Sequence, residues 1–186
     1  LHWGRGKKSD NYVTLIYQID AGCRRLLWVG LKRTEGSFRA GLKELGTAAL
    51  SSVRFVCSDM WKPFLKVIRT ELPEALNILD RFHIAAHLNA AVDNVRRTEV
   101  GSLKKGAKKE AGKKLKNMRF TLLRRSQNVR GKARVRLEEV IKSKGATARA
   151  WLLKEGFQHF WTYRSVDWAL GFLDAWITRA LRSRLE

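Results

Sequence analysis

Segments with the composition of β-strands occur only in the first eighty residues, and this asymmetry restricts the fold more than any other feature of the chain. The segments are rich in β-branched, aromatic or other apolar residues and are bounded by turn signals. They are residues 11–20 (NYVTLIYQID), 25–31 (RLLWVGL), 53–57 (VRFVC) and 77–79. Between them, apolar spacing predicts one helix that begins after Thr34 and stops at Gly46, and another over 61–71.

The order hairpin, helix, strand, helix, strand predicts an α/β fold with one mixed sheet and a hairpin at one side, because strands joined through helices lie parallel. We therefore assign residues 1–82 to an α/β part and residues 83–186 to an all-helical part. The later helices are predicted over 83–97, 134–144, 146–163 and 167–185. Ser165 is the predicted N-cap of the last helix. Trp168, Phe172, Trp176 and Leu181 are predicted to share one broad face of it.

The charge of the chain indicates its partner rather than its fold. Lys and Arg number 38 against 17 Asp and Glu, a formal charge of +21 in 186 residues, while 45% hydrophobic residues suffice for a core. Such a chain attracts polyanions, with nucleic acid as the first candidate and an anionic membrane surface as the second. No apolar run approaches the roughly 18 residues of a membrane span. Cys23 and Cys57 form no ligand cluster, so we expect buried, reduced thiols in a cytosolic protein.

Much of the positive charge is concentrated between Arg96 and Arg136, which hold sixteen Lys or Arg and two acids, Glu99 and Glu110. This imbalance favours phosphate binding over a solvated, salt-bridged surface. The candidate DNA-binding residues are Arg96, Arg97, Lys104, Lys105, Lys108, Lys109, Lys113, Lys114, Arg124 and Arg125. Most of the seven tryptophans have the spacing of core residues, and Trp61 alone is kept as a candidate site residue.

Asp59 and Asp80 each end a short apolar strand, the position where functional groups gather in open α/β sheets. If the strands are neighbours, the two carboxylates can share a divalent cation such as Mg²⁺. The alternative is that each Asp caps the helix that follows it. His83 follows Asp80 closely and is a candidate for lining the site, while a zinc pair of His83 with His87 lacks a third ligand.

Four ordered elements between Cys57 and Arg97 resemble the core of the ISL3-type DDE transposases of insertion sequences. They are Asp59-Met60-Trp61-Lys62-Pro63, Pro73-Glu74-Ala75, Asp80-Arg81-Phe82-His83, and Ala91-Val92-Asp93-Asn94-Val95-Arg96-Arg97. Upstream, Tyr12-Val13-Thr14 and Leu26-Leu27-Trp28-Val29-Gly30 are similar to the family's first hairpin. Downstream, Leu153-Lys154-Glu155 and the helix of Trp176 are similar to its helical insertion.

The resemblance implies a ribonuclease-H-like fold, here a partial core over 1–82 followed by a basic helical insertion over 83–186. It also implies an Asp-Asp-Glu triad that holds two Mg²⁺ or Mn²⁺ ions. Asp59 matches the second Asp of the triad and is the expected catalytic and metal-binding residue, whereas Asp80 matches a motif position beside the site. The first Asp is expected just before Leu1 and the Glu after Glu186, so we expect this polypeptide to be inactive alone.

The function implied by the resemblance is metal-dependent DNA strand cleavage and strand transfer of an insertion sequence. The implied partners are transposon-end and target DNA and further copies of the protein, with no membrane. The implied location is the bacterial cytoplasm, in association with the nucleoid. The alternative is a non-enzymatic basic nucleic-acid-binding protein, which predicts DNA binding that survives Asp59→Ala and needs no metal.

Overall fold

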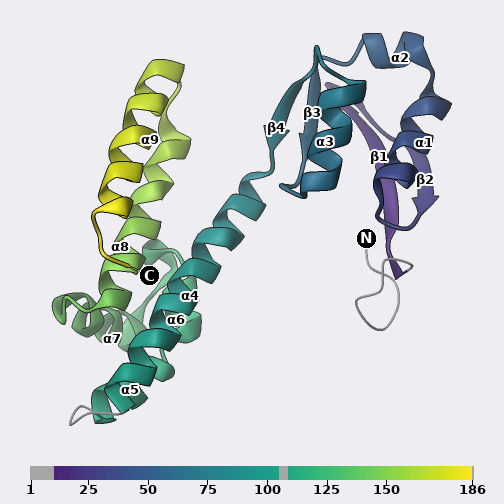
Figure 1. The fold of residues 1–186 in the computed structure, drawn as a ribbon. Helices are drawn as coiled ribbons and strands as arrows, with labels where there is room; N and C mark the ends of the chain where they lie inside the picture. Colours follow the sequence, from purple (N-terminus) through teal and green to yellow (C-terminus); the bar gives the residue numbers. More distant parts are fainter. Residues whose placement is uncertain (1–10, 105–108, 186) are drawn as a thin grey trace. The chain divides into compact units, whose positions relative to one another are not determined.

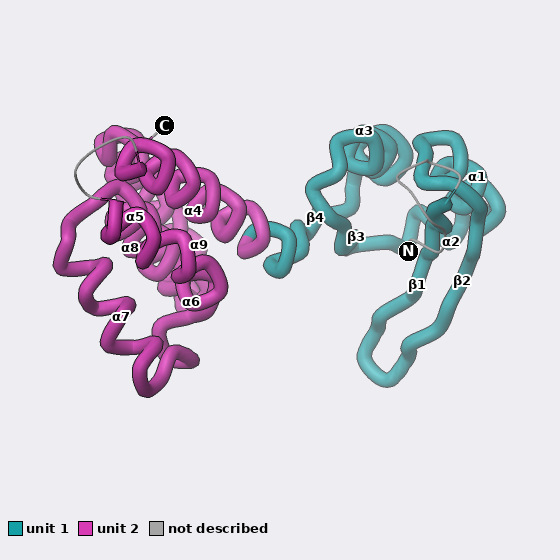
Figure 2. The backbone as a smooth tube through the Cα atoms, turned by 90° about the horizontal axis from the view of Figure 1, so that it is seen from below, with its two compact units in different colours: residues 1–84 teal, residues 85–186 magenta. Residues whose placement is uncertain are grey.

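The computed structural model describes residues 11–104 and 109–185, which form two compact units within residues 1–84 and 85–186 (Figures 1 and 2). Each unit has its own hydrophobic core. Among the described residues, every helix is too short or too polar to cross a membrane.

The first unit opens with a hairpin of β1 (Val13–Asp20) and β2 (Cys23–Leu31). The two strands pair antiparallel from Val13 opposite Leu31 to Asp20 opposite Cys23. The turn between them needs a residue in the left-handed region, and Gly22 supplies it with a φ of 77°. The sequence predicted this hairpin, and the structure confirms it.

Helix α1 (Glu35–Leu45) follows the hairpin and has the predicted boundaries. The Thr34 hydroxyl accepts a hydrogen bond from the Ser37 N–H at 3.0 Å, and the backbone leaves the helix at Gly46 with a φ of 80°. The helix packs closely on the hairpin at Gly41, where a Cβ atom would lie 2.6 Å from the Trp28 ring. A short helix, α2 (Thr47–Ser51), was not predicted.

The second half of this unit is a parallel strand pair with a crossover helix. Strand β3 (Phe55–Ser58) leads into α3 (Lys62–Glu71), with Pro63 in its first turn, and then into β4 (Leu76–Leu79). The strands pair in register from Phe55 opposite Leu76 to Ser58 opposite Leu79. Helices α1 and α3 supply the buried core of the unit, which consists of Phe38, Leu42, Val67, Ile68 and Leu72.

The predicted single mixed sheet is wrong in one respect. The described residues form two separate two-stranded sheets, β1–β2 and β3–β4, with no hydrogen-bonded ladder between them. Composition and periodicity identify a strand, but the choice of partner depends on contacts distant in sequence, which periodicity does not encode. The described part of the unit is therefore an α/β arrangement with the expected element order and a divided sheet.

The described secondary-structure elements of the second unit are all helices, as predicted. Helix α4 (Arg81–Lys104) spans the boundary between the two units. It is longer than the predicted segment 83–97. The elements that follow are α5 (Lys109–Lys116), α6 (Arg119–Leu123), η2 (Ser126–Asn128), α7 (Gly131–Lys142), α8 (Ala146–Phe157), η3 (Gln158–Thr162) and α9 (Val166–Leu181). The core includes Val92, Leu122, Leu137 and Trp151.

One local prediction for a capping group is met in position only, and two predictions for buried groups are wrong. Ser165 occupies the predicted N-cap position of α9, but its side chain makes no capping hydrogen bond. Helix α9 has no fully buried residue, and Trp168 on its predicted apolar face is 73% exposed rather than part of a core. Cys57 is a free, exposed thiol, since it alternates with Val56 along β3 and Val56 occupies the side packed on the core.

Candidate active site and nucleic-acid interface

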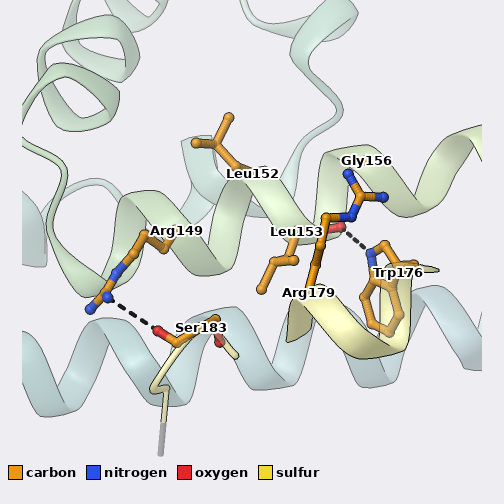
Figure 3. Close-up of a pocket in the computed structure, with 7 residues that line it drawn as sticks. All are labelled: Arg149, Leu152, Leu153, Gly156, Trp176, Arg179 and Ser183. Atoms are coloured by element: carbon orange, nitrogen blue, oxygen red, sulfur yellow. Dashed lines mark hydrogen bonds between the residues drawn. The ribbon is translucent and has the colours of Figure 1, made fainter. Parts of the chain in front are cut away.

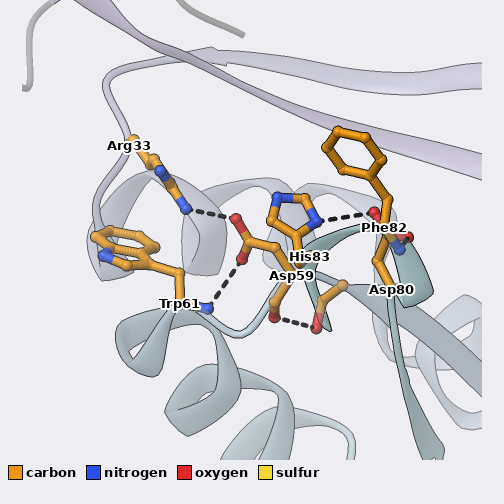
Figure 4. Close-up of polar contacts among 7 residues, drawn as sticks. Arg33, Asp59, Trp61, Asp80, Phe82 and His83 are labelled. Atoms are coloured by element: carbon orange, nitrogen blue, oxygen red, sulfur yellow. Dashed lines mark hydrogen bonds and ion pairs between the residues drawn. The ribbon is translucent and has the colours of Figure 1, made fainter. Parts of the chain in front are cut away.

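Asp59 and Asp80 follow paired residues of two parallel neighbours. Ser58 and Leu79 are partners at the ends of β3 and β4, and the Asp80 N–H donates to the Ser58 carbonyl oxygen at 2.9 Å. Because carboxyl ends of parallel strands share one edge, both aspartates leave the sheet at that edge (Figure 4). The sequence-based premise that these two strands are neighbours is confirmed.

The Asp59 carboxylate is held by groups on either side of it. Its Oδ2 atom accepts from Arg33 at 2.5 Å, and its Oδ1 atom accepts from the Trp61 backbone N–H at 3.0 Å. The Arg33 guanidinium also lies 4.4 Å from the centre of the Trp61 ring, a cation–π contact (Figure 4). The Asp59 side chain stays 24% exposed, so it remains partly accessible to solvent.

Arg33 is the site residue that sequence reasoning missed. It belongs to the connection between β2 and α1, outside every element that carried a motif. A single arginine in a chain with 38 basic residues gives no distinguishing signal. Only the fold brings it to an aspartate 26 positions later.

The Asp80 carboxylate both caps a helix and pairs with the predicted histidine. Its Oδ1 atom accepts from the Phe82 N–H at 2.8 Å, at the start of α4, and its Oδ2 atom lies 2.8 Å from His83 Nδ1. The backbone hydrogen bond from Phe82, followed by the His83 contact, lowers the pKa of Asp80 below its usual value. The capping alternative considered from sequence is therefore correct for Asp80.

The donor set at this edge suits a hard divalent cation in kind but is incomplete. Mg²⁺ prefers carboxylate oxygens and takes one or two of them, with water and phosphate oxygens completing its shell. Asp59 and Asp80 offer such oxygens. Within residues 11–104 and 109–185, however, no group of three His, Cys, Asp or Glu side chains is arranged to hold a metal. A zinc site built on His83 and His87 gains no support from that part of the chain.

Most of the candidate DNA-binding residues that the structure describes are exposed, and Arg96 is the exception. Arg96 is buried at 6% exposure and forms an ion pair with Asp93, so it does not offer its guanidinium to a ligand from solution. The sequence shows that Arg96 is charged but does not show that it faces the core, so the charge alone assigned it to the basic surface. Lys105 and Lys108 lie outside the described residues. The exposed candidates are Arg97, Lys104, Lys109, Lys113, Lys114, Arg124 and Arg125.

The second unit also has a hollow of about 260 Å³ between α8 and α9 (Figure 3). Leu152, Leu153 and Trp176 contribute its apolar lining, and the Trp176 indole N–H donates to the Leu153 carbonyl oxygen at 2.9 Å. Arg149 and Arg179 also line it, and no carboxylate does. The hollow therefore lacks the ligands of a DDE site.

The chain thus has an aspartate pair at the strand ends of its first unit and a strongly basic surface on its helical second unit. The sequence model of a family described as transposase, DDE_Tnp_ISL3, matches residues 3–186. The chain therefore belongs to the ISL3 family of DDE transposases.

Curated relatives agree with this assignment. The chain is 27% identical over 177 residues to the transposase for insertion sequence element IS1001 of Bordetella parapertussis, covering 95% of this chain and 43% of that protein. It is 23% identical over 198 residues to the transposase for insertion sequence element IS1557 of Mycobacterium tuberculosis, covering 96% and 44%. The chain thus spans less than half the length of these relatives. No solved structure matched it.

Proposed function

We propose that this chain is the central part of a transposase that cuts and joins insertion-sequence DNA by metal-dependent phosphoryl transfer. The observation that carries the proposal is the placement of Asp59 and Asp80 at one edge of the parallel pair, within a chain of the ISL3 family. The proposed fold of the whole catalytic domain is ribonuclease-H-like. Its remaining two triad carboxylates would lie in segments outside these 186 residues.

In this proposal Asp59 is the metal ligand and Asp80 positions the edge around it. Two divalent ions, Mg²⁺ or Mn²⁺, would supply activation of the attacking oxygen and stabilisation of the leaving oxygen when bound. Arg33 neutralises Asp59 in the structure described here. Its guanidinium has five N–H donors and would be able to hold a DNA phosphate if a cation replaced it at the carboxylate.

The second unit would grip DNA through its phosphates. Its exposed lysines and arginines provide a sequence-independent and strongly salt-dependent attraction. A transposition complex of several copies, working on DNA in the bacterial cytoplasm at the nucleoid, follows from the same proposal. Trp61 is engaged by Arg33 and Phe64, which favours a packing role over base stacking.

The test is strand cleavage by the intact transposase that contains this segment, on DNA that carries the insertion-sequence ends. Asp59→Ala is expected to abolish Mg²⁺- and Mn²⁺-dependent cleavage, whereas DNA binding persists. Asp20→Ala is the matched control, because Asp20 is the last residue of β1 and belongs to the other sheet. Cleavage that survives Asp59→Ala would refute the assignment.

The fragment itself gives a second test. Residues 1–186 alone should bind DNA without cutting it, because they provide one triad carboxylate. Mg²⁺-dependent nicking by the fragment would show that the catalytic ligands were assigned wrongly. If the intact protein bound DNA but never cleaved it under any metal condition, the non-enzymatic DNA-binding alternative would replace the proposal.

A further inference from the structure

Asp93 lies at the centre of three arginines in the second unit. Arg96 and Arg97 follow it on α4, and Arg119 comes from the start of α6. The Asp93 Oδ1 atom accepts from Arg96 Nε at 2.9 Å and from Arg96 Nη2 at 2.7 Å. The Oδ2 atom lies 2.8 Å from Arg97 Nη2 and 3.6 Å from Arg119 Nε. One carboxylate therefore organises three guanidinium groups.

Burial divides the three arginines into two kinds. The side chains of Asp93 and Arg96 are each 7% exposed, so they form an interior ion pair, which Arg96 extends to the Lys116 carbonyl oxygen at 3.3 Å. The side chains of Arg97 and Arg119 are 62% and 48% exposed. Since Arg96 already neutralises Asp93, the exposed pair carries excess positive charge toward solvent.

The exposed pair borders a hollow of about 260 Å³. Besides the two arginines, the polar side chains of Asn89, Asn94 and Asp93 contribute to its lining. The complete lining is Asn89, Ala90, Asp93, Asn94, Arg97, Arg119 and Leu123. Two guanidinium groups and two neutral amides beside a concave surface provide hydrogen-bond donors of the kind that bind phosphate oxygens.

The Asp93 carboxylate also lies within ion-pair distance of both exposed arginines and so restrains these donors before a ligand arrives. Burial alone would raise the pKa of Asp93, but the Arg96 hydrogen bond and the charges of the three arginines lower it below its usual value, so the carboxylate stays ionised. An arginine held at one edge of its planar fork loses less conformational freedom when its other donors bind a ligand. Free surface lysines lack this preorganisation.

We propose that Arg97 and Arg119 form a preorganised seat for a backbone phosphate of duplex DNA, with Asp93 as its positioning residue. The inference rests on the proposed function, since it names the place where the helical unit contacts DNA. Duplex DNA is the occupant because, among the described residues of the stretch 96–136, every exposed charged side chain except Glu110 is basic. The positive surface that attracts a long polyanion therefore extends beyond the seat itself.

The experiment compares two double variants of the 186-residue chain that remove equal charge. Binding to a short fluorescein-labelled duplex is followed by anisotropy over a series of salt concentrations. Arg97→Ala with Arg119→Ala is expected to weaken binding roughly tenfold or more and to reduce the salt slope by about two. Lys132→Ala with Arg136→Ala, both exposed on α7, should change the affinity and the slope much less.

A third variant separates geometry from charge. Arg97→Lys with Arg119→Lys retains the charge and loses the planar fork, so its affinity should fall between those of the wild type and the alanine pair. If the variant with both lysines bound the duplex with full wild-type affinity, the proposed phosphate seat would be wrong. Equal losses in the two alanine pairs would also overturn it, because the field of the whole unit would then account for binding.

Two controls make failures distinguishable. Thermal unfolding of each variant reports whether the helical unit is intact. If the double alanine variant does not fold, Arg119→Ala alone replaces it, because the contact of Arg119 with Asp93 is the longest of the three. If the wild-type chain does not bind the duplex, the DNA contact of the proposed function fails. If the wild type binds and the two alanine pairs behave alike, only the seat fails.

Discussion

The molecule holds carboxylates in two contrasting environments, one buried among arginines and the other partly exposed at the edge of a sheet. In the second unit, Asp93 is buried and bound by three arginines. In the first unit, Asp59 and Asp80 lie at a sheet edge with side chains that are 24% and 45% exposed. The Asp93 carboxylate is enclosed by side chains of the protein, whereas the other two carboxylates remain partly exposed to solvent.

The two environments differ because the residues that contact each carboxylate come from different parts of the chain. Arg96 and Arg97 follow Asp93 by one helical turn, so helix geometry alone delivers them. Asp59 obtains Arg33 from a distant loop, and Asp80 pairs with His83, whose positive charge depends on protonation. A divalent cation competes easily with an exposed pair but not with a buried one, because the latter has already lost its hydration.

The largest effect is expected from Asp93→Ala. Removing the carboxylate leaves the buried Arg96 guanidinium without its counter-ion, which costs about 3–5 kcal/mol of folding free energy in comparable buried pairs. Urea unfolding followed by far-UV circular dichroism measures this loss. Asp174→Ala, at an exposed position of α9, is the matched control and should change stability by no more than about 0.5 kcal/mol. If the two substitutions changed the free energy of unfolding equally, the buried carboxylate would contribute no more to stability than an exposed one.

Acid titration examines the same contrast through pH. The lowered pKa of Asp93 means that the folded state holds its proton less tightly than the unfolded state, whose Asp titrates near 3.8. The stabilisation is therefore complete above that pH and is lost as pH falls below it toward the folded-state pKa. Asp93→Asn should make the free energy of unfolding less dependent on pH in this window. An unchanged slope would show that Asp93 is not the responsible group.

Sequence reasoning predicted the features that depend on neighbouring residues. Thr34 and Gly46 bound α1, and the strand ends before Asp59 and Asp80 are where the apolar runs indicated. In each case the cause lies within a few residues of the effect: a hydroxyl that caps, a glycine that permits positive φ, a run that favours a strand. The parallel pairing also followed, because a crossover helix separates the two strands.

The missed features depend on partners that are distant or on which side of a helix faces the core. Arg33 reaches Asp59 across 26 positions, and the two strand pairs do not join into one sheet within the described residues. Arg96 carries the same charge as Arg97 in the sequence, yet one is buried and the other exposed. Charge alone predicted both arginines as members of a phosphate-binding surface, and only packing separates the exposed arginine from the buried one.

A smaller effect is expected from Asp80→Ala, which removes the acceptor of the Phe82 N–H at the start of α4. Loss of such a helix cap costs about 1 kcal/mol. Asp80→Ser is the matched variant, because a serine hydroxyl caps the helix and does not replace the contact with His83. Thermal unfolding should therefore recover most of its wild-type midpoint in the serine variant. A serine variant as unstable as the alanine variant would show that the His83 pair, rather than the cap, stabilises this edge.

The smallest change in stability is expected from Asp59→Asn, although the proposed chemistry depends on this residue most. The asparagine keeps an oxygen for the Trp61 N–H, and the lost ion pair with the partly exposed Arg33 is worth less than about 1 kcal/mol. Urea unfolding should thus be close to wild type while metal-dependent cleavage by the intact protein is lost. A residue that is dispensable for folding and required for reaction is a ligand for something outside the chain. A large loss of stability would instead place Asp59 with Asp93, among the carboxylates that maintain the fold.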